Sequence, residues 1–284
     1  MTLLTVSTVK GAPGGSTVAL LLARAISATP VDDRRCVLAE CDLSGGDLAP
    51  CLGLPGVPGV ASLALAARHG LTVEILFAHT QSPACAPSLQ VLPGVAGPEQ
   101  GMALSWILAD LGRVLQEPSI VAVADLGRVR VEHDGNDELR SLAAANVLVT
   151  NDDVASLLHA RAAVESAADA GTSLQIVLAG KRTRRVSHVS RATGAEVLGA
   201  VRYDPKALSR LLRLEQSVAG PSSRRPRCAR GLISDAEAIA AKLSDPDSRR
   251  GEPAGSVEAT EDESVSSVRS GVLGRRRRRG VLVG

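Results

Sequence analysis

The residues best suited to chemistry lie near the amino terminus, between an apolar run and a run of helical character. They form a glycine-rich stretch with one lysine and two hydroxyl side chains: Val9, Lys10, Gly11, Ala12, Pro13, Gly14, Gly15, Ser16 and Thr17. Residues 3–9 predict a buried strand, and residues 18–25 predict a helix. A glycine-rich turn in this position exposes backbone N–H groups at the positive end of a helix dipole, where phosphate binds. This stretch is therefore the candidate phosphate-binding loop.

The loop lacks the lysine that loops of the G-x-x-x-x-G-K-[ST] type place directly before the hydroxyl residue. Gly15 occupies that position, and Lys10 is the lysine that remains in the stretch. Removal of one charged interaction with a triphosphate costs on the order of 2–4 kcal/mol of transition-state stabilisation, about a hundredfold or more in rate. We therefore expect nucleotide binding more than turnover, and the residues alone leave open whether Lys10 compensates for Gly15.

Carboxylates follow two later apolar runs. One run, residues 36–39, predicts a strand that leads into Glu40 and Asp42. The other, residues 120–124, predicts a strand that ends in Asp125. Open α/β sheets bind ligands at the carboxyl ends of their strands, and carboxylate oxygens coordinate Mg²⁺. We expect Asp125 to hold Mg²⁺, whereas Glu40 and Asp42 either handle metal and water or merely face solvent.

The rest of the pattern alternates apolar runs with helix-like segments. Further strands are predicted at residues 89–92, 147–149, 174–179 and 197–201, and helices at residues 61–68, 99–115, 153–170, 205–214 and 235–243. Apolar runs without alternation indicate strands buried on both faces, as in a parallel sheet. We predict an α/β fold of three layers, the P-loop NTPase arrangement, with helices on both faces of a mostly parallel central sheet.

The composition changes toward the carboxyl terminus. Residues 1–243 carry the apolar pattern and predict one P-loop domain, whereas residues 244–284 predict a disordered charged tail. The tail contains a block of five arginines, Arg275–Arg279. This block either contacts nucleic acid or anionic lipid electrostatically, or belongs to a solvated tail without function.

The overall composition excludes several classes of function. Aromatic residues make up 1% of the chain, too few for a stacking platform on single-stranded nucleic acid, and the net charge of +2 indicates no particular partner. The five cysteines form no C-x-x-C pair, so reduced thiols are expected. No apolar run approaches the length of a membrane span. We expect a cytoplasmic protein.

Taken in order, these motifs resemble the MinD/ParA group of P-loop ATPases, whose deviant Walker A loop reads K-G-G-x-G-K-[ST]-[ST]. Residues 10–17 follow that pattern except at Ala12 and Gly15. The resemblance makes Lys10 the signature lysine and Ser16 the hydroxyl ligand of Mg²⁺. The resemblance covers the whole predicted domain. The loop sequences are most similar to those of a divergent actinobacterial-type branch that includes CpaE/TadZ-like proteins.

The same resemblance assigns roles to the carboxylates. Glu40 and Asp42 fall on the family's Asp-x-Asp, whose second aspartate positions the attacking water, and Asp125 falls on the Walker B aspartate. Residues 197–204 resemble the family's strand and loop near the adenine. Residues 180–182, Gly-Lys-Arg, replace the asparagine that many relatives use on adenine.

The resemblance implies ATP and Mg²⁺ as cofactors and a nucleotide-dependent homodimer in which Lys10 reaches the phosphates of the other subunit. The implied function is that of a positioning switch in chromosome partition, septum placement or localisation of a Tad or secretion machine, with a partner protein and at the membrane or nucleoid. Two alternatives stay open. One is a pseudo-ATPase scaffold without turnover, which Gly15 favours. The other is a partition protein that binds DNA non-specifically through arginines at 224–230 and 275–279.

Overall fold

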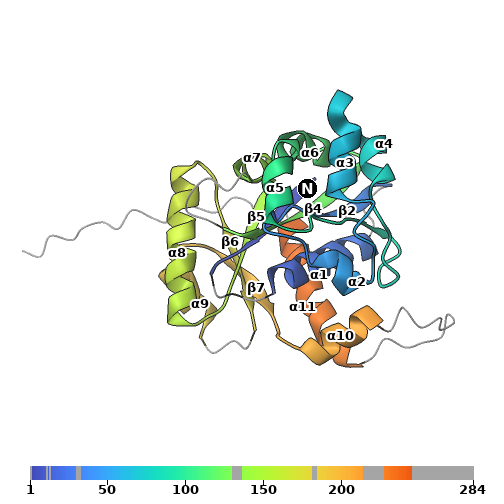
Figure 1. Ribbon diagram of the computed structural model, residues 1–284. Helices are drawn as coiled ribbons and strands as arrows, with labels where there is room; N and C mark the ends of the chain where they lie inside the picture. Colours follow the sequence, from blue (N-terminus) through green and yellow to red (C-terminus); the bar gives the residue numbers. More distant parts are fainter. Residues whose placement is uncertain are drawn as a thin grey trace, which may run out of the picture. The chain divides into compact units, whose positions relative to one another are not determined.

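The computed structural model describes residues 2–10, 12, 14–29, 33–129, 136–180, 184–213 and 227–244. These residues form a parallel sheet of seven strands in the order β3-β2-β4-β1-β5-β6-β7 (Figure 1). The strands are β1 (Leu3–Thr8), β2 (Arg35–Glu40), β3 (Leu89–Leu92), β4 (Ile120–Arg128), β5 (Ala145–Thr150), β6 (Gln175–Ala179) and β7 (Val197–Val201). The strand that leads into the glycine-rich loop, β1, thus lies between β4 and β5.

Helices cover both faces of the sheet (Figure 1). On one face lie α1 (Gly15–Ala28), α2 (Leu48–Leu52), α10 (Pro205–Arg213) and α11 (Arg227–Ser244). The other face carries α3 (Val60–Ala66), the 3₁₀-helix η1 (Ala67–His69), α4 (Val73–Ala78), α5 (Pro98–Leu104), α6 (Ile107–Leu115), α7 (Asp137–Leu142), α8 (Val154–Asp169) and α9 (Val186–Thr193). The predicted three-layer α/β fold is confirmed.

The residues of β2 show why the central strands are apolar at successive positions. Cys36 and Leu38 are buried in the cluster that α1 and α11 cover, whereas Val37 and Ala39 are buried in the cluster under α3 and α6. Neighbouring residues of a strand point to opposite faces of the sheet. A strand covered on both faces therefore needs apolar side chains throughout, which is the pattern the sequence indicated.

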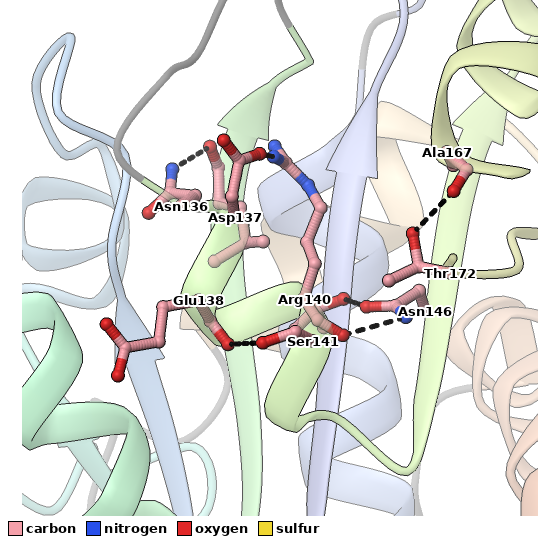
Figure 2. A network of polar contacts seen from close by, with 10 residues as sticks. Asn136, Asp137, Glu138, Arg140, Ser141, Asn146, Ala167 and Thr172 are labelled. Atoms are coloured by element: carbon pink, nitrogen blue, oxygen red, sulfur yellow. Dashed lines mark hydrogen bonds and ion pairs between the residues drawn. The ribbon is translucent and has the colours of Figure 1, made fainter. Parts of the chain in front are cut away.

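A polar network attaches α7 to the sheet (Figure 2). The side-chain amide of Asn136 donates to the carbonyl oxygen of Leu126 in β4 (3.4 Å), and that of Asn146 donates to the carbonyl oxygen of Arg140 (3.1 Å). The Thr5 hydroxyl donates to Asn146 Oδ1 (2.5 Å). These bonds satisfy buried polar groups in the middle of the sheet and connect the end of β4 to β5 and β1.

The first helix and the segment of residues 99–115 differ from their predicted limits. The first helix begins at Gly15 rather than at residue 18, because Gly14, with φ +100°, turns the chain directly into α1. The segment predicted as one helix, residues 99–115, is divided into α5 and α6. The division lies at Ser105, whose hydroxyl donates to a carbonyl oxygen of the preceding turn (3.0 Å), a bond that competes with the helical ladder.

Strand β4 is longer than predicted. The apolar run ends at Asp125, but the strand continues to Arg128. Its pairing with β1 shifts between Val6 and Thr8, and Gly127 adopts φ +66° in the same stretch. A polar and glycine-containing extension of this kind depends on the neighbouring strand, so the apolar pattern gave no sign of it.

Several predicted features fall outside the described residues: Gly11 and Pro13 of the loop, Lys181 and Arg182, residues 224–226 of the first arginine cluster, and residues 245–284. The limits of the predicted domain and tail therefore stay predictions. Helix α11 begins at Arg227, well before the predicted residue 235, because Leu232 and Ile233 are also buried. In the described part of the chain, every helix is too short or too polar to cross a membrane.

Candidate functional site

The glycine-rich loop lies at the carboxyl edge of the sheet, where β1 passes into α1. Lys10 is exposed at the start of the loop, and the Ala12 N–H donates to the carbonyl oxygen of Val9 (3.2 Å). Gly14 holds a left-handed conformation that favours glycine, and α1 follows it directly. The first turn of a helix leaves N–H groups without helical partners. The described loop residues thus place a left-handed glycine and the first turn of a helix directly after β1, two features of anion-binding turns.

Gly15 has no room for a side chain. A Cβ atom at this buried position would lie 2.1 Å from Cγ2 of Thr8, far inside the contact distance of two carbon atoms. The position before Ser16 is therefore closed to lysine as long as Thr8 keeps its methyl group where it lies. The sequence revealed that a lysine is missing, and the structure identifies the side chain that takes its space.

Asp125 is completely buried, with 0% of its surface exposed. Its Oδ1 accepts a hydrogen bond from the Gly127 N–H (3.1 Å), whereas Oδ2 has no hydrogen-bond partner among the residues that the structure describes. Burial raises the pKa of Asp125 to about 6; the nearby Ser16 hydroxyl and the Gly127 N–H lower it, and Glu40 and Asp42 raise it. A buried acceptor without a partner costs about 1–3 kcal/mol or more. A cation at Oδ2 would remove that cost, so the Asp125 carboxylate is suited to bind Mg²⁺.

Asp42 lies close to Asp125, although β2 and β4 are far apart in sequence. Its Oδ1 accepts from the Ser44 N–H (2.8 Å), which folds the following loop back over the strand end. Its carboxylate contacts Gly127, where a Cβ atom would meet Oδ2 at 2.1 Å. Only glycine fits there, and its φ of +66° also favours glycine. The structure thus brings the two predicted aspartates to one place.

Glu40 does not face solvent, which was one of the two interpretations that the sequence left open. It is 2% exposed, and its carboxylate accepts three main-chain hydrogen bonds, from Asp47 (2.6 Å), Leu48 (2.8 Å) and Gly94 (2.8 Å). Burial raises the pKa of Glu40, and these three bonds oppose the rise. The solvent-facing interpretation is wrong for Glu40. Both carboxylate oxygens hold the loops that follow β2 and β3.

A cavity of about 150 Å³ lies beside the glycine-rich loop. Gly14 and Thr17 form one wall, and Gly180 and Tyr203 lie at the carboxyl ends of β6 and β7 on the other. The segment 197–204, which resembles a strand and loop near the adenine, therefore borders a cavity next to the candidate phosphate site. Its position beside the glycine-rich loop is where a base or sugar would adjoin bound phosphates.

The loop after β7 is fixed by its own side chains. Asp204 Oδ1 accepts from the Ala207 N–H (2.8 Å) and caps α10. Arg202 forms a two-bond ion pair with Asp235 of α11 through Nε (2.7 Å) and a terminal nitrogen (2.9 Å). Both acidic groups are thereby engaged in structure, and the cavity wall is held in a defined conformation.

Lys10 borders a second cavity, of about 390 Å³, between the ends of β1 and β4 and the helix α8. Arg128 and His159 lie in the wall of the same cavity. Sequence reasoning did not single out Arg128, because the apolar run that marks β4 stops at Asp125. Its position depends on strand pairing and is visible only in the folded chain.

Solved structures of ParA and MinD proteins share this fold. The ParA family ATPase of Chlorobium tepidum TLS matches with a TM-score of 0.67 at 21% identity, over 84% of this chain and 98% of that one. MinD of Pyrococcus horikoshii OT3, complexed with Mg-ADP, matches with a TM-score of 0.59 at 16% identity, over 86% and 96%. The MinC:MinD cell division protein complex of Aquifex aeolicus contains a chain that matches with a TM-score of 0.61 at 14% identity, over 86% and 95%.

No protein-family model and no curated protein matches the chain. At the identities of the solved structures the likeness concerns the fold, and the predicted MinD/ParA-like fold is confirmed. The finer resemblance to CpaE/TadZ-like proteins stays a prediction.

Proposed function

We propose that the protein binds MgATP at residues 10–17 and uses the nucleotide to switch between monomer and homodimer, as a positioning protein of the MinD/ParA kind. The observation that carries the proposal is the Asp125 carboxylate, buried beside Ser16 with Oδ2 unpartnered among the described residues. The similar fold of a MinD protein holds Mg-ADP, and another occurs in a MinC:MinD complex. A partner protein is therefore part of the proposal.

In this proposal the residues of the loop and of the strand ends have separate roles. The Ser16 hydroxyl and Asp125 Oδ2 hold Mg²⁺, and the first N–H groups of α1 bind phosphate oxygens. Bound Mg²⁺ supplies positive charge that neutralises the phosphate oxygens. Asp42, held by the Ser44 N–H and by its contact with Gly127, orients a water molecule through its carboxylate.

Hydrolysis in this proposal is weak, because Gly15 stands at the lysine position and the Thr8 methyl group fills the space that a side chain there would need. The same observation favours the second candidate, a pseudo-ATPase scaffold that keeps the fold and partner surface without turnover. The two candidates make different predictions for the oligomeric state. A switch dimerises only with nucleotide, whereas a scaffold is indifferent to it.

Light scattering of the full chain without nucleotide, with MgADP and with MgATP tests the proposal. We expect the molar mass to double with MgATP alone, and the Lys10→Ala variant to remain monomeric under the same conditions. An identical mass in all three conditions contradicts the switch. A dimer that persists without nucleotide and does not hydrolyse ATP supports the scaffold instead.

A further inference from the structure

The closed position at Gly15 leaves the candidate triphosphate site with Lys10 as the one cation among the described loop residues. An ATP molecule carries several negative charges on its phosphates, and Mg²⁺ neutralises only part of them. A second cation would strengthen binding where the missing lysine would reach the β- and γ-phosphates. A cation in that role would lie near Thr8, which occupies the space of that lysine.

Strand pairing brings Arg128 to this place. Val6 pairs with Asp125, but two residues later Thr8 pairs with Arg128, so β4 carries one more residue than β1 across this interval. Gly127, with φ +66°, lies within the irregular stretch. With regular pairing Gly127 would lie opposite Thr8, and Arg128 would lie one position further on. Bulges of this kind re-aim a side chain near a functional site.

The pairing is held by the main chain. The Val129 N–H donates to the carbonyl oxygen of Thr8 (2.9 Å), directly after Arg128. Thr8 in turn contacts Gly15, since its Cγ2 lies 2.1 Å from the position of a Cβ there. Neighbouring strands are about 4.8 Å apart. The main chain of Arg128 is thus one strand spacing from that of Thr8, whose methyl group fills the lysine's place, and Arg128 lines a cavity together with Lys10 at the start of the loop.

The charge around Arg128 suits an anion. Arg128 is exposed and shares the wall of the 390 Å³ cavity with Lys10 and His159, and no carboxylate lies in that wall as far as the described residues form it. Neither Arg128 nor Lys10 forms an ion pair with any residue that the structure describes. A guanidinium offers several N–H donors in one plane and binds two phosphate oxygens at once.

We propose that Arg128 is a second phosphate-binding cation of this site, which acts beside Lys10 in nucleotide binding and does not replace the missing lysine in hydrolysis. The proposal rests on the proposed nucleotide-binding function and assigns it a residue. Because the replaced lysine serves the β- and γ-phosphates, Arg128 contributes more to the binding of ATP than to that of ADP.

Isothermal titration of MgATP and MgADP into the full-length wild type, Arg128→Ala, Arg128→Lys and Arg191→Ala tests the proposal. Arg191 lies exposed in the last turn of α9, at the opposite edge of the sheet, and is the matched control for the loss of one positive charge. We expect Arg128→Ala to weaken MgATP binding about ten- to a hundredfold, as expected when one charged hydrogen bond is removed, and MgADP binding by about threefold at most. Arg128→Lys recovers part of the loss, and Arg191→Ala has no effect.

The outcomes separate this proposal from the function on which it rests. Retained MgADP binding shows that Arg128→Ala is folded. If the wild type binds MgATP and Arg128→Ala binds it equally well, the role of Arg128 is wrong and the proposed function stands. An equal loss in Arg191→Ala also overturns the role, because net charge then explains the effect. If the wild type binds neither nucleotide, the proposed function fails, and the role of Arg128 fails with it.

Discussion

The ends of β2 and β4 present two buried carboxylates side by side, and their surroundings differ. Glu40 and Asp125 are partners in the strand register, and both are almost completely buried. Glu40 accepts three main-chain hydrogen bonds on its two oxygens. Asp125 accepts one on Oδ1, and its Oδ2 has no partner in the described part of the chain. Burial alone therefore does not identify a functional carboxylate.

The difference separates a structural role from a ligand-binding role. A carboxylate whose oxygens are saturated by N–H groups has little capacity left for a metal ion, and its removal disrupts the loops that it holds. A carboxylate with an unpartnered oxygen destabilises the folded chain until a cation arrives. We therefore assign Glu40 to the architecture of the edge and Asp125 to the proposed Mg²⁺ site.

Removal of the Glu40 carboxylate has the largest expected effect on stability. Glu40→Ala leaves three main-chain N–H groups without an acceptor, one buried and two partly buried; a buried group costs about 1–3 kcal/mol and a partly buried one less. We expect the free energy of unfolding to fall by about 2–4 kcal/mol in chemical denaturation. Asp42→Ala, which removes one acceptor at a half-buried position, is the control and costs about 1 kcal/mol. Equal stabilities of the two variants would refute the contrast.

Removal of the Asp125 charge is expected to raise the free energy of unfolding, whereas removal of the Glu40 carboxylate lowers it. The pKa of Asp125 is about 6 in the folded chain against an ordinary value of 3.8, so between these pH values the folded state binds more protons than the unfolded state. The free energy of unfolding of the metal-free protein therefore falls as pH rises from about 4 to about 6, by roughly 3 kcal/mol for this group. Asp125→Asn lacks this dependence.

Denaturation of the metal-free protein at several pH values measures the effect. We expect Asp125→Asn to match the wild type near pH 4 and to be more stable near pH 7. Glu40 and Asp42 raise the pKa of Asp125, so the difference between the two curves reports the Asp125 charge together with its interaction with these two carboxylates. A variant that is less stable than the wild type at pH 7 would mean that Asp125 is a structural carboxylate like Glu40.

Replacement of Gly15 by the missing lysine has the smallest expected effect on stability and the clearest effect on the rate of ATP hydrolysis. Gly15→Lys collides with the Thr8 methyl group and costs about 1–3 kcal/mol, the usual range for overpacking. Thr8→Ser removes that methyl group, so Thr8→Ser/Gly15→Lys regains most of the loss. The coupling in a double-mutant cycle is about 1–2 kcal/mol. Thr8→Ser alone is the control.

The same double variant tests the account of weak hydrolysis. We expect it to hydrolyse ATP faster than the wild type, because a cation again lies before Ser16. Steady-state phosphate release measures the rate. Unchanged hydrolysis in a stable double variant would show that the lysine position is not what limits turnover.

The sequence predicted the sheet, the glycine-rich loop and the two aspartates, because each depends on local features: apolar runs, glycine spacing and carboxylates at strand ends. It did not predict the role of Glu40, since its three donors come from loops up to Gly94. The closure of Gly15 by Thr8 and the pairing of Thr8 with Arg128 depend on contacts between strands and helix. Such contacts leave no periodic signal in a single sequence.

Isothermal titration of the wild type and Asp125→Asn with MgATP, and of the wild type with ATP in EDTA, tests the central claim most directly. We predict that the wild type binds MgATP with a Kd well below 1 mM, corresponding to more than about 4 kcal/mol of binding free energy. Removal of Mg²⁺ or of the Asp125 charge should weaken this binding by about tenfold or more. Absence of binding up to millimolar MgATP, or equal binding in all three titrations, would contradict the claim that Asp125 holds Mg²⁺ for a nucleotide.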